Sequence, residues 1–195
     1  DGIFNQGGSF LQMSRFKPKD SDFENNFNLK FFTDNKIKLL VTVGGDDTAS
    51  TANRIAKFLE AKKYPIANIH VPKTIDNDLW GTDMTFGFQS AVNIATDALD
   101  CIHTTAASHG RVFIVEVMGH KVGWLTLNAG IAGGADIILV PEIPYDIDKI
   151  VEKINERHNR GSRFTILAVA EGAISKEDAK LSKKEYKKKL ENYKY

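Results

Sequence analysis

The sequence has few of the features that mark secreted, membrane-spanning or nucleic-acid-binding chains. Its 195 residues include one cysteine, Cys101, which has no partner for an internal disulfide and falls in a helical apolar pattern. We therefore expect Cys101 to fill a core in a reducing compartment. No apolar run approaches the roughly 18 residues that cross a bilayer. The formal net charge of +1 gives no electrostatic case for a nucleic acid or a membrane surface as a partner.

Short apolar runs alternate with helical patterns along most of the chain. Strand-like runs cover 37–43, 69–71, 112–117, 137–140 and 165–170. Helical patterns cover 52–59, 91–102, 122–131 and 147–154, and the four-residue spacing of Phe23, Phe27 and Phe31 indicates one more helix. Such alternation predicts an α/β fold, a Rossmann-like, doubly wound and mainly parallel sheet with helices on both faces. Ligands of these sheets bind at the carboxyl ends of the strands.

The first strand ends in Gly44-Gly45-Asp46-Asp47-Thr48. Glycines let a phosphate approach the backbone, and the helix that follows favours anions at its start. The Asp46 carboxylate is suited to hold Mg²⁺, directly or through water. The alternative is a tight turn with aspartates that cap the helix.

The second strand ends at a cation, a hydroxyl and two carboxylates, namely Lys73, Thr74, Asp76 and Asp78. A base, a hydroxyl and a cation at one strand end suit the transfer of a phosphoryl group. The alternative is a surface turn rich in Asp and Asn, since these residues favour turns.

Two more strand ends carry polar or glycine-rich residues. Met118-Gly119-His120 follows the strand at 112–117, and Glu171-Gly172 follows the last strand. One shared site is the economical explanation for four such strand ends. We expect Trp80 and Phe86, farther from these ends, to serve in packing.

Together these residues resemble the 6-phosphofructokinases. The matching segments, in family order and spacing, are Gly44-Gly45-Asp46-Asp47, Pro72-Lys73-Thr74-Ile75-Asp76-Asn77-Asp78, Met118-Gly119-His120 and Ala129-Gly130-Ile131-Ala132-Gly133-Gly134. Gly7-Gly8-Ser9 and Arg15-Phe16 resemble the segment that precedes them, so the likeness covers 7–175.

The resemblance implies a cytoplasmic enzyme that phosphorylates the 1-hydroxyl of fructose 6-phosphate with Mg²⁺ as cofactor. Asp76 would be the general base, Thr74 would contact the transferred phosphoryl group and Lys73 would assist them. Asp46 would serve Mg²⁺ and Asp78 would support the site.

The resemblance also implies a set of sugar-binding residues. Thr74 and Asp76 would touch the sugar at the reacting hydroxyl. The other positions are Arg111, Met118, Gly119, His120 and Glu171. Arg111 matches an arginine that reaches the sugar phosphate of a neighbouring subunit, which implies a homo-oligomer. His120 stands where many members of the family have arginine.

Three residues match donor-binding positions: Arg15, Gly45 and Asp47. Asp47 together with Lys73 resembles the pyrophosphate-dependent type. The Asp47 side chain would intrude on the nucleotide α-phosphate, and Lys73 would add a cation for a small, highly charged donor. Pyrophosphate is therefore the expected donor, with ATP as the alternative.

The chain is expected to be a fragment, because it starts without methionine and lacks the family's glycine-rich phosphate loop and its later sugar-phosphate residues. We expect a remnant of the donor-binding region at 1–36, the α/β core at 37–175 and a lysine-rich extension at 176–195. Two other functions stay open: a related kinase that acts on NAD or a lipid, and a non-catalytic regulatory subunit.

Overall fold

The structure is a computed structural model that describes residues 2–10 and 12–192. The chain forms two compact units, which we call unit 1 and unit 2; unit 1 ends at Val71 and unit 2 begins at Pro72. The boundary falls inside strand β2 (Ala67–Thr74). The core expected over 37–175 therefore includes parts of both units.

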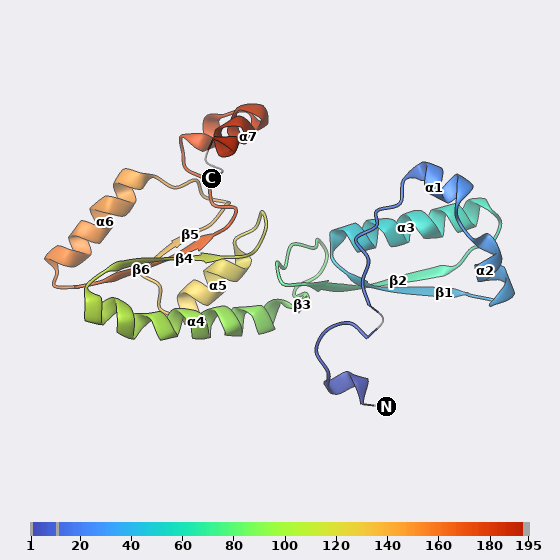
Figure 1. The fold of residues 1–195 in the computed structure, drawn as a ribbon, viewed down its shortest axis with the longest axis horizontal. Coiled ribbons are helices and arrows are strands. Elements are labelled where there is room, and N and C mark those ends of the chain that lie inside the picture. Colours follow the sequence, from blue (N-terminus) through green and yellow to red (C-terminus); the bar gives the residue numbers. More distant parts are fainter. Residues whose placement is uncertain (1, 11, 193–195) are drawn as a thin grey trace. The chain divides into compact units, whose positions relative to one another are not determined.

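Unit 1 is built on β1 (Leu39–Gly44), the first part of β2 and helix α3 (Asp46–Ala61), which lies along one face of these strands (Figure 1). Ala52 and Leu59 of α3 are buried against this face. Alternate residues of β1 point the other way, so Leu39 and Val41 are exposed.

Three short helices precede β1 in unit 1: η1 (Ile3–Asn5), α1 (Asp20–Asn25) and α2 (Leu29–Asp34). The prediction of one helix through Phe23, Phe27 and Phe31 is wrong. The Asn28 side chain accepts a hydrogen bond from Phe31 N and so begins a second helix. The phenylalanines still gather, because the Phe27 ring lies 6.0 Å from Phe23 and 5.0 Å from Phe58 of α3.

Unit 2 contains the parallel sheet β4-β6-β5, made of β4 (Val112–Val117), β6 (Thr165–Ala170) and β5 (Ile137–Leu139). A short strand, β3 (Phe86–Gly87), pairs in parallel with the end of β2. The expected α/β fold with parallel strands is confirmed, and the strands fall into two sheets of three. β3 carries no apolar run, and only its pairing with β2 identifies it as a strand.

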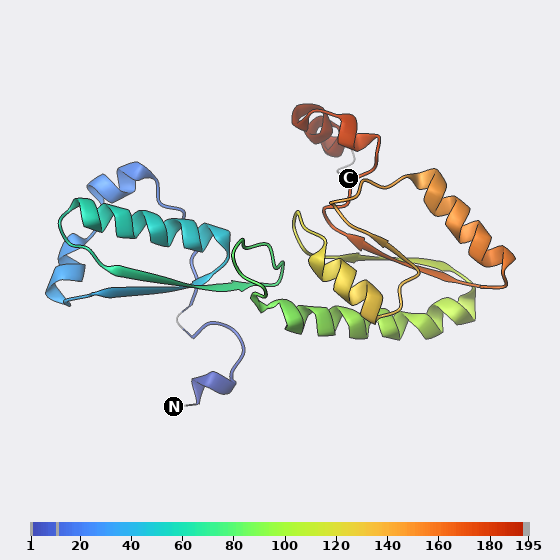
Figure 2. The ribbon, with the colours of Figure 1, turned by 180° about the vertical axis from the view of Figure 1, so that it is seen from behind.

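Helices cover both faces of the unit 2 sheet. Helices α4 (Phe88–His109) and α5 (Trp124–Ala132) lie on one face, and α6 (Ile147–Asn159) lies on the other (Figures 1 and 2). The core between α4, α5 and the sheet contains Leu99, Ala129 and Ile166. Cys101 is exposed, which corrects its expected place in the core. It lies two residues beyond Leu99 and so falls on the opposite side of α4.

The lysine-rich end of the chain forms η2 (Asp178–Lys180) and α7 (Lys183–Glu191). Ser182 caps α7 by accepting a hydrogen bond from Glu185 N. Among residues 2–10 and 12–192, no helix combines the length and apolarity needed to cross a membrane.

An ion pair connects the end of α6 to the sheet of unit 2. Arg157 lies 2.5 Å from Asp136, and both side chains are mostly buried. The second carboxylate oxygen of Asp136 accepts a hydrogen bond from Ile166 N at 2.9 Å. One carboxylate therefore holds together α6, the start of β5 and the start of β6.

We predict that Asp136→Ala lowers the free energy of unfolding by about 2–4 kcal/mol, because it leaves a largely buried guanidinium and a backbone N–H unpaired. Urea unfolding followed by circular dichroism measures this change. Asp97→Ala, at an exposed position of α4, is the control and should stay within about 0.5 kcal/mol of the unmodified protein. Equal stability of the two variants would show that the Asp136 carboxylate does not hold α6, β5 and β6 together.

Candidate active site

The register of the unit 2 sheet places two strand ends side by side. Val117 of β4 is paired with Ala170 of β6, so Met118 and Glu171 are the first residues beyond the two strands. Glu171 N extends the ladder by donating to the Val117 carbonyl at 2.9 Å. Parallel pairing therefore brings together two segments that are about fifty residues apart in the sequence.

The Glu171 carboxylate shapes the loop that follows β4. Its Oε1 atom accepts hydrogen bonds from Gly119 N, at 3.0 Å, and from His120 N. His120 has a left-handed backbone, with φ of 53°. Gly172 approaches the same loop so closely that a Cβ atom there would collide with the His120 carbonyl. Oε2 of Glu171 has no partner in the part of the chain that the structure describes, so it is available to a ligand hydroxyl.

The segment after β2 carries the Asp76 and Asp78 carboxylates. Thr74 is the last residue of β2, and its hydroxyl oxygen accepts a hydrogen bond from Asp76 N at 3.1 Å. Asp76 is half-buried, whereas Asp78 and Lys73 are exposed. Asn77, between the two aspartates, has a left-handed φ of 55°. The chain therefore turns sharply between the two carboxylates.

Asp76 has the electrostatic character of a base. Burial raises the pKa of the Asp76 carboxyl above its ordinary value, and the negative charges of Asp78 and Glu171 raise it further. His120 and the Thr74 hydroxyl oppose this rise. A carboxylate with raised proton affinity beside other ionisable groups is typical of a site that moves protons. The same interactions show that the segments after β2, β4 and β6 lie in one region of unit 2.

The remaining strand end, Gly44–Thr48, belongs to unit 1. Gly44 lets the chain pass from β1 into α3, since a Cβ atom there would collide with Thr48. Asp46 begins α3 with an exposed carboxylate that has no partner among the described residues. Asp47 lies 2.5 Å from Lys17, and both side chains are largely exposed, so the pair is weak. Arg15 is exposed in the segment before α1.

Arg111 lies away from the other predicted sugar-binding residues of unit 2. It directly precedes β4, whereas Met118 directly follows it. The six residues of β4 separate the two by about 20 Å at the usual rise of a strand. Arg111 does not join the strand-end cluster of its own chain, and its expected role in a neighbouring subunit stays a prediction.

Asn77, Thr85 and Glu142 were not predicted to have a role in the site. Asn77 Oδ1 accepts a hydrogen bond from Thr85 N, and the Thr85 hydroxyl donates to the Thr74 carbonyl. The Glu142 carboxylate accepts a hydrogen bond from Gly123 N at 2.8 Å. Asn readily adopts left-handed turns, and that signal could have marked Asn77. The expectation that Trp80 and Phe86 pack inside is wrong, because Trp80 is fully exposed and Phe86 largely so.

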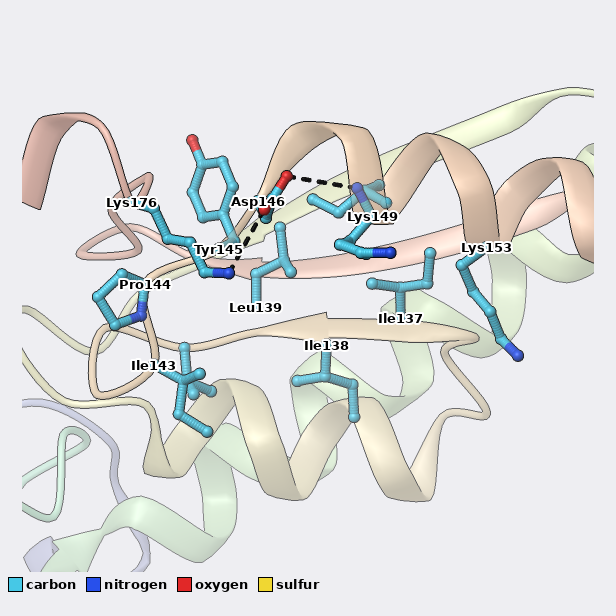
Figure 3. Close-up of a pocket in the computed structure, with 12 residues that line it drawn as sticks. Ile137, Ile138, Leu139, Ile143, Pro144, Tyr145, Asp146, Lys149, Lys153 and Lys176 are labelled. Carbon is cyan, nitrogen blue, oxygen red and sulfur yellow. Dashed lines mark hydrogen bonds and ion pairs between the residues drawn. The ribbon is translucent and has the colours of Figure 1, made fainter.

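A cavity of about 350 Å³ lies elsewhere in unit 2, between β5 and α6 (Figure 3). Ile137 and Leu139 point from β5 toward α6, while Ile138 points toward α5 (Figure 3). The lysines that line the cavity each have an acidic partner; the pairs are Lys149–Glu152, Lys153–Glu156 and Lys176–Asp146. The described residues that line the cavity include none of the predicted site residues and no unpaired cation for a phosphate.

Comparison with known proteins identifies related chains of known class. The phosphofructokinase family matches residues 1–194. The chain is 49% identical over 194 residues to the ATP-dependent 6-phosphofructokinase of Spirochaeta thermophila, covering 94% of this chain and 51% of the relative. It is 46% identical over 180 residues to ATP-dependent 6-phosphofructokinase 3 of Bacteroides thetaiotaomicron, covering 89% and 52%. The chain thus spans about half the length of these curated relatives.

Solved structures show the same likeness. Pichia pastoris phosphofructokinase in the T-state matches 94% of this chain and 21% of its own, with a TM-score of 0.75 and 32% identity. The pyrophosphate-dependent phosphofructokinase of Marinobacter aquaeolei matches 86% and 44%, with a TM-score of 0.74 and 30% identity. The family match over almost the whole chain, with the strand-end motifs in family order, shows that this chain belongs to the phosphofructokinase family.

Proposed function

We propose that the protein transfers a phosphoryl group to the 1-hydroxyl of fructose 6-phosphate and so forms fructose 1,6-bisphosphate. The observation that carries the proposal is Asp76, a half-buried carboxylate of raised pKa between strand ends that phosphofructokinase motifs occupy. Phosphoryl transfer to an alcohol needs a carboxylate that orients and deprotonates the attacking hydroxyl. Asp76 supplies that group.

The neighbours of Asp76 suit the sugar and the transferred group. The Thr74 hydroxyl, beside the Asp76 backbone, is proposed to contact the phosphoryl group. The loop at Met118–His120, together with the free oxygen of Glu171, is proposed to hold the sugar hydroxyls. Lys73, exposed at the end of β2, would add positive charge near the transferring oxygens.

Mg²⁺ is the proposed metal, with Asp46 as its protein ligand. The described residues contain no group of three or more His, Cys, Asp or Glu side chains that could hold a metal ion by themselves. Mg²⁺ needs no such group, because it usually binds one or two carboxylates, substrate phosphates and waters. The exposed and unpaired Asp46 carboxylate at the start of α3 fits that requirement. When bound, Mg²⁺ neutralises charge on the donor phosphates.

ATP is the favoured donor. The curated relatives with 44–49% identity are named ATP-dependent, which supports the alternative donor over pyrophosphate. Asp47 pairs with Lys17, so part of the charge that would repel a nucleotide is offset. The presence in the sequence of both Asp47 and Lys73 supports pyrophosphate as the donor. The likeness to solved pyrophosphate-dependent enzymes at 30% identity supports it as well. A homo-oligomer that shares Arg111, and a cytoplasmic location, remain predictions.

The first test removes the base. Asp76→Asn keeps the shape of the side chain but cannot take a proton, so kcat should fall about 10²–10⁴-fold. The assay follows fructose 1,6-bisphosphate in the full-length natural protein, because the curated relatives are about twice the length of this chain. Asp83→Asn, an exposed carboxylate of the same segment, is the matched control and should keep its kcat. A fully active Asp76→Asn variant would remove Asp76 from the mechanism.

The second test follows pH. Because Asp76 acts when deprotonated and its pKa is raised, kcat/KM should fall on the acid side at a higher pH than an ordinary aspartate would give. Asp78→Asn removes a like charge, lowers the pKa of Asp76 and should move this acid limb to lower pH. The pH profiles of the two proteins measure the shift. An unmoved limb would show that Asp78 does not act on the base.

The third test compares donors. We expect a higher kcat/KM with ATP than with pyrophosphate, and Lys17→Met should lower kcat/KM for ATP by up to about fivefold, because it exposes the Asp47 charge. Lys30→Met, at an exposed position of α2, is the control. Efficient turnover with pyrophosphate and none with ATP would reverse the donor assignment.

A further inference from the structure

Hydrogen bonds from two side chains close the segment that carries Asp76 and Asp78. Thr85 is almost fully buried, at 2% exposure, and its hydroxyl donates to the Thr74 carbonyl at 2.8 Å. Oδ1 of Asn77 accepts from Thr85 N at 2.9 Å, and Nδ2 of Asn77 donates to the Asp83 carbonyl at 3.4 Å. The two ends of the segment are thereby joined across its base.

The closure is connected to a buried cluster of unit 2. Thr85 directly precedes β3, and its carbonyl accepts a hydrogen bond from Phe88 N at the start of α4. Phe88 is buried in a cluster with Val92 and Val117 of β4, against which Ile75 also packs. Asn77 and Thr85 therefore connect the two aspartates to the core of the unit.

Little else holds the outer part of this segment. Trp80 is fully exposed and buries none of its apolar surface, and Met84 buries only about half of its own. Asp78 makes no hydrogen bond or ion pair with any residue that the structure describes. The hydrogen bonds of Asn77 and Thr85 are therefore the main side-chain contacts that join the two ends of this segment.

The backbone at Asn77 adds a second constraint. Its φ of 55° is left-handed, a conformation that costs energy for residues other than glycine and is most readily adopted by Asn and Asp. Surrounding contacts must maintain such a conformation, and here they come from the Asn77 side chain itself. The turn sets the directions of the flanking Asp76 and Asp78.

We propose that Asn77 and Thr85 are positioning residues, which fix the Asp76 carboxylate beside Asp78 and Glu171 in the geometry needed for proton transfer. This inference rests on the proposed function of Asp76. It gives the hydrogen bonds of Asn77 and Thr85, which we call the brace, a role in the chemistry. Without the brace the segment still connects β2 to α4, but Asp76 moves toward solvent and away from Asp78 and Glu171.

Three variants test the brace in the full-length natural protein. Asn77→Gly removes the amide while leaving a residue that adopts positive φ freely, so it isolates the hydrogen bonds from the backbone turn. Thr85→Val removes the hydroxyl at nearly equal volume, and Thr85→Ser restores it. Thr82→Val is the matched control, because the Thr82 hydroxyl bonds only within the outer part of the segment, to the Met84 carbonyl.

Two measurements separate positioning from general stability. Hydrogen–deuterium exchange followed by mass spectrometry should show faster exchange at 75–86 in Asn77→Gly and Thr85→Val, with 112–117 and 165–170 unchanged. In the same variants kcat should fall by roughly 10²-fold, as expected for a displaced catalytic group, while KM changes little. The acid limb of kcat/KM should also move to lower pH. Thr85→Ser and Thr82→Val should retain native exchange and kcat.

The outcomes distinguish the two proposals. Native exchange at 75–86 in both brace variants would overturn the brace, whatever the enzyme's activity. Faster exchange with an unmoved acid limb and native kcat would overturn its role in positioning, as would faster exchange spread over 112–117 and 165–170. A fully active Asp76→Asn variant would instead overturn the proposed function, while the exchange data would still report whether the brace exists.

Discussion

Parallel pairing of β4 with β6 is the constraint on which the site in unit 2 depends. It aligns Val117 with Ala170, so the residues that follow them, Met118 and Glu171, lie side by side at one edge of the sheet. Glu171 then reaches the backbone N–H groups of Gly119 and His120, which gives the loop after β4 its shape. The Asp76 segment completes this edge, since its carboxylate lies within electrostatic reach of Glu171 and His120.

The site concentrates negative charge in a chain whose net charge is only +1. Asp78 and Glu171 both repel the charge of Asp76, and this repulsion adds to burial in raising the pKa of Asp76. Local hydrogen bonds at Thr74, Asn77 and Thr85 hold the segment that carries Asp76 and Asp78. Such an arrangement is typical of a site that moves protons.

Elements with a strong apolar pattern were predicted well. The strand at 112–117 was expected at the residues where it is found, and the helix pattern at 91–102 lies within α4. Predictions failed where a side-chain hydrogen bond or strand pairing, rather than the apolar pattern, decided the local structure. The Asn28 cap split the helix expected at the phenylalanines, and β3 exists only because its two residues pair with β2. Trp80 has an apolar side chain but is fully exposed.

The sequence by itself determined the α/β class, the order of the strand-end motifs and membership of the phosphofructokinase family, because each depends on residue types at short spacings. Only the tertiary structure decided that Glu171 binds the loop after β4, that burial and like charges raise the pKa of Asp76, and that Thr85 closes the segment around Asn77. These features depend on distances between residues far apart in the chain, which folding sets and local sequence patterns do not record.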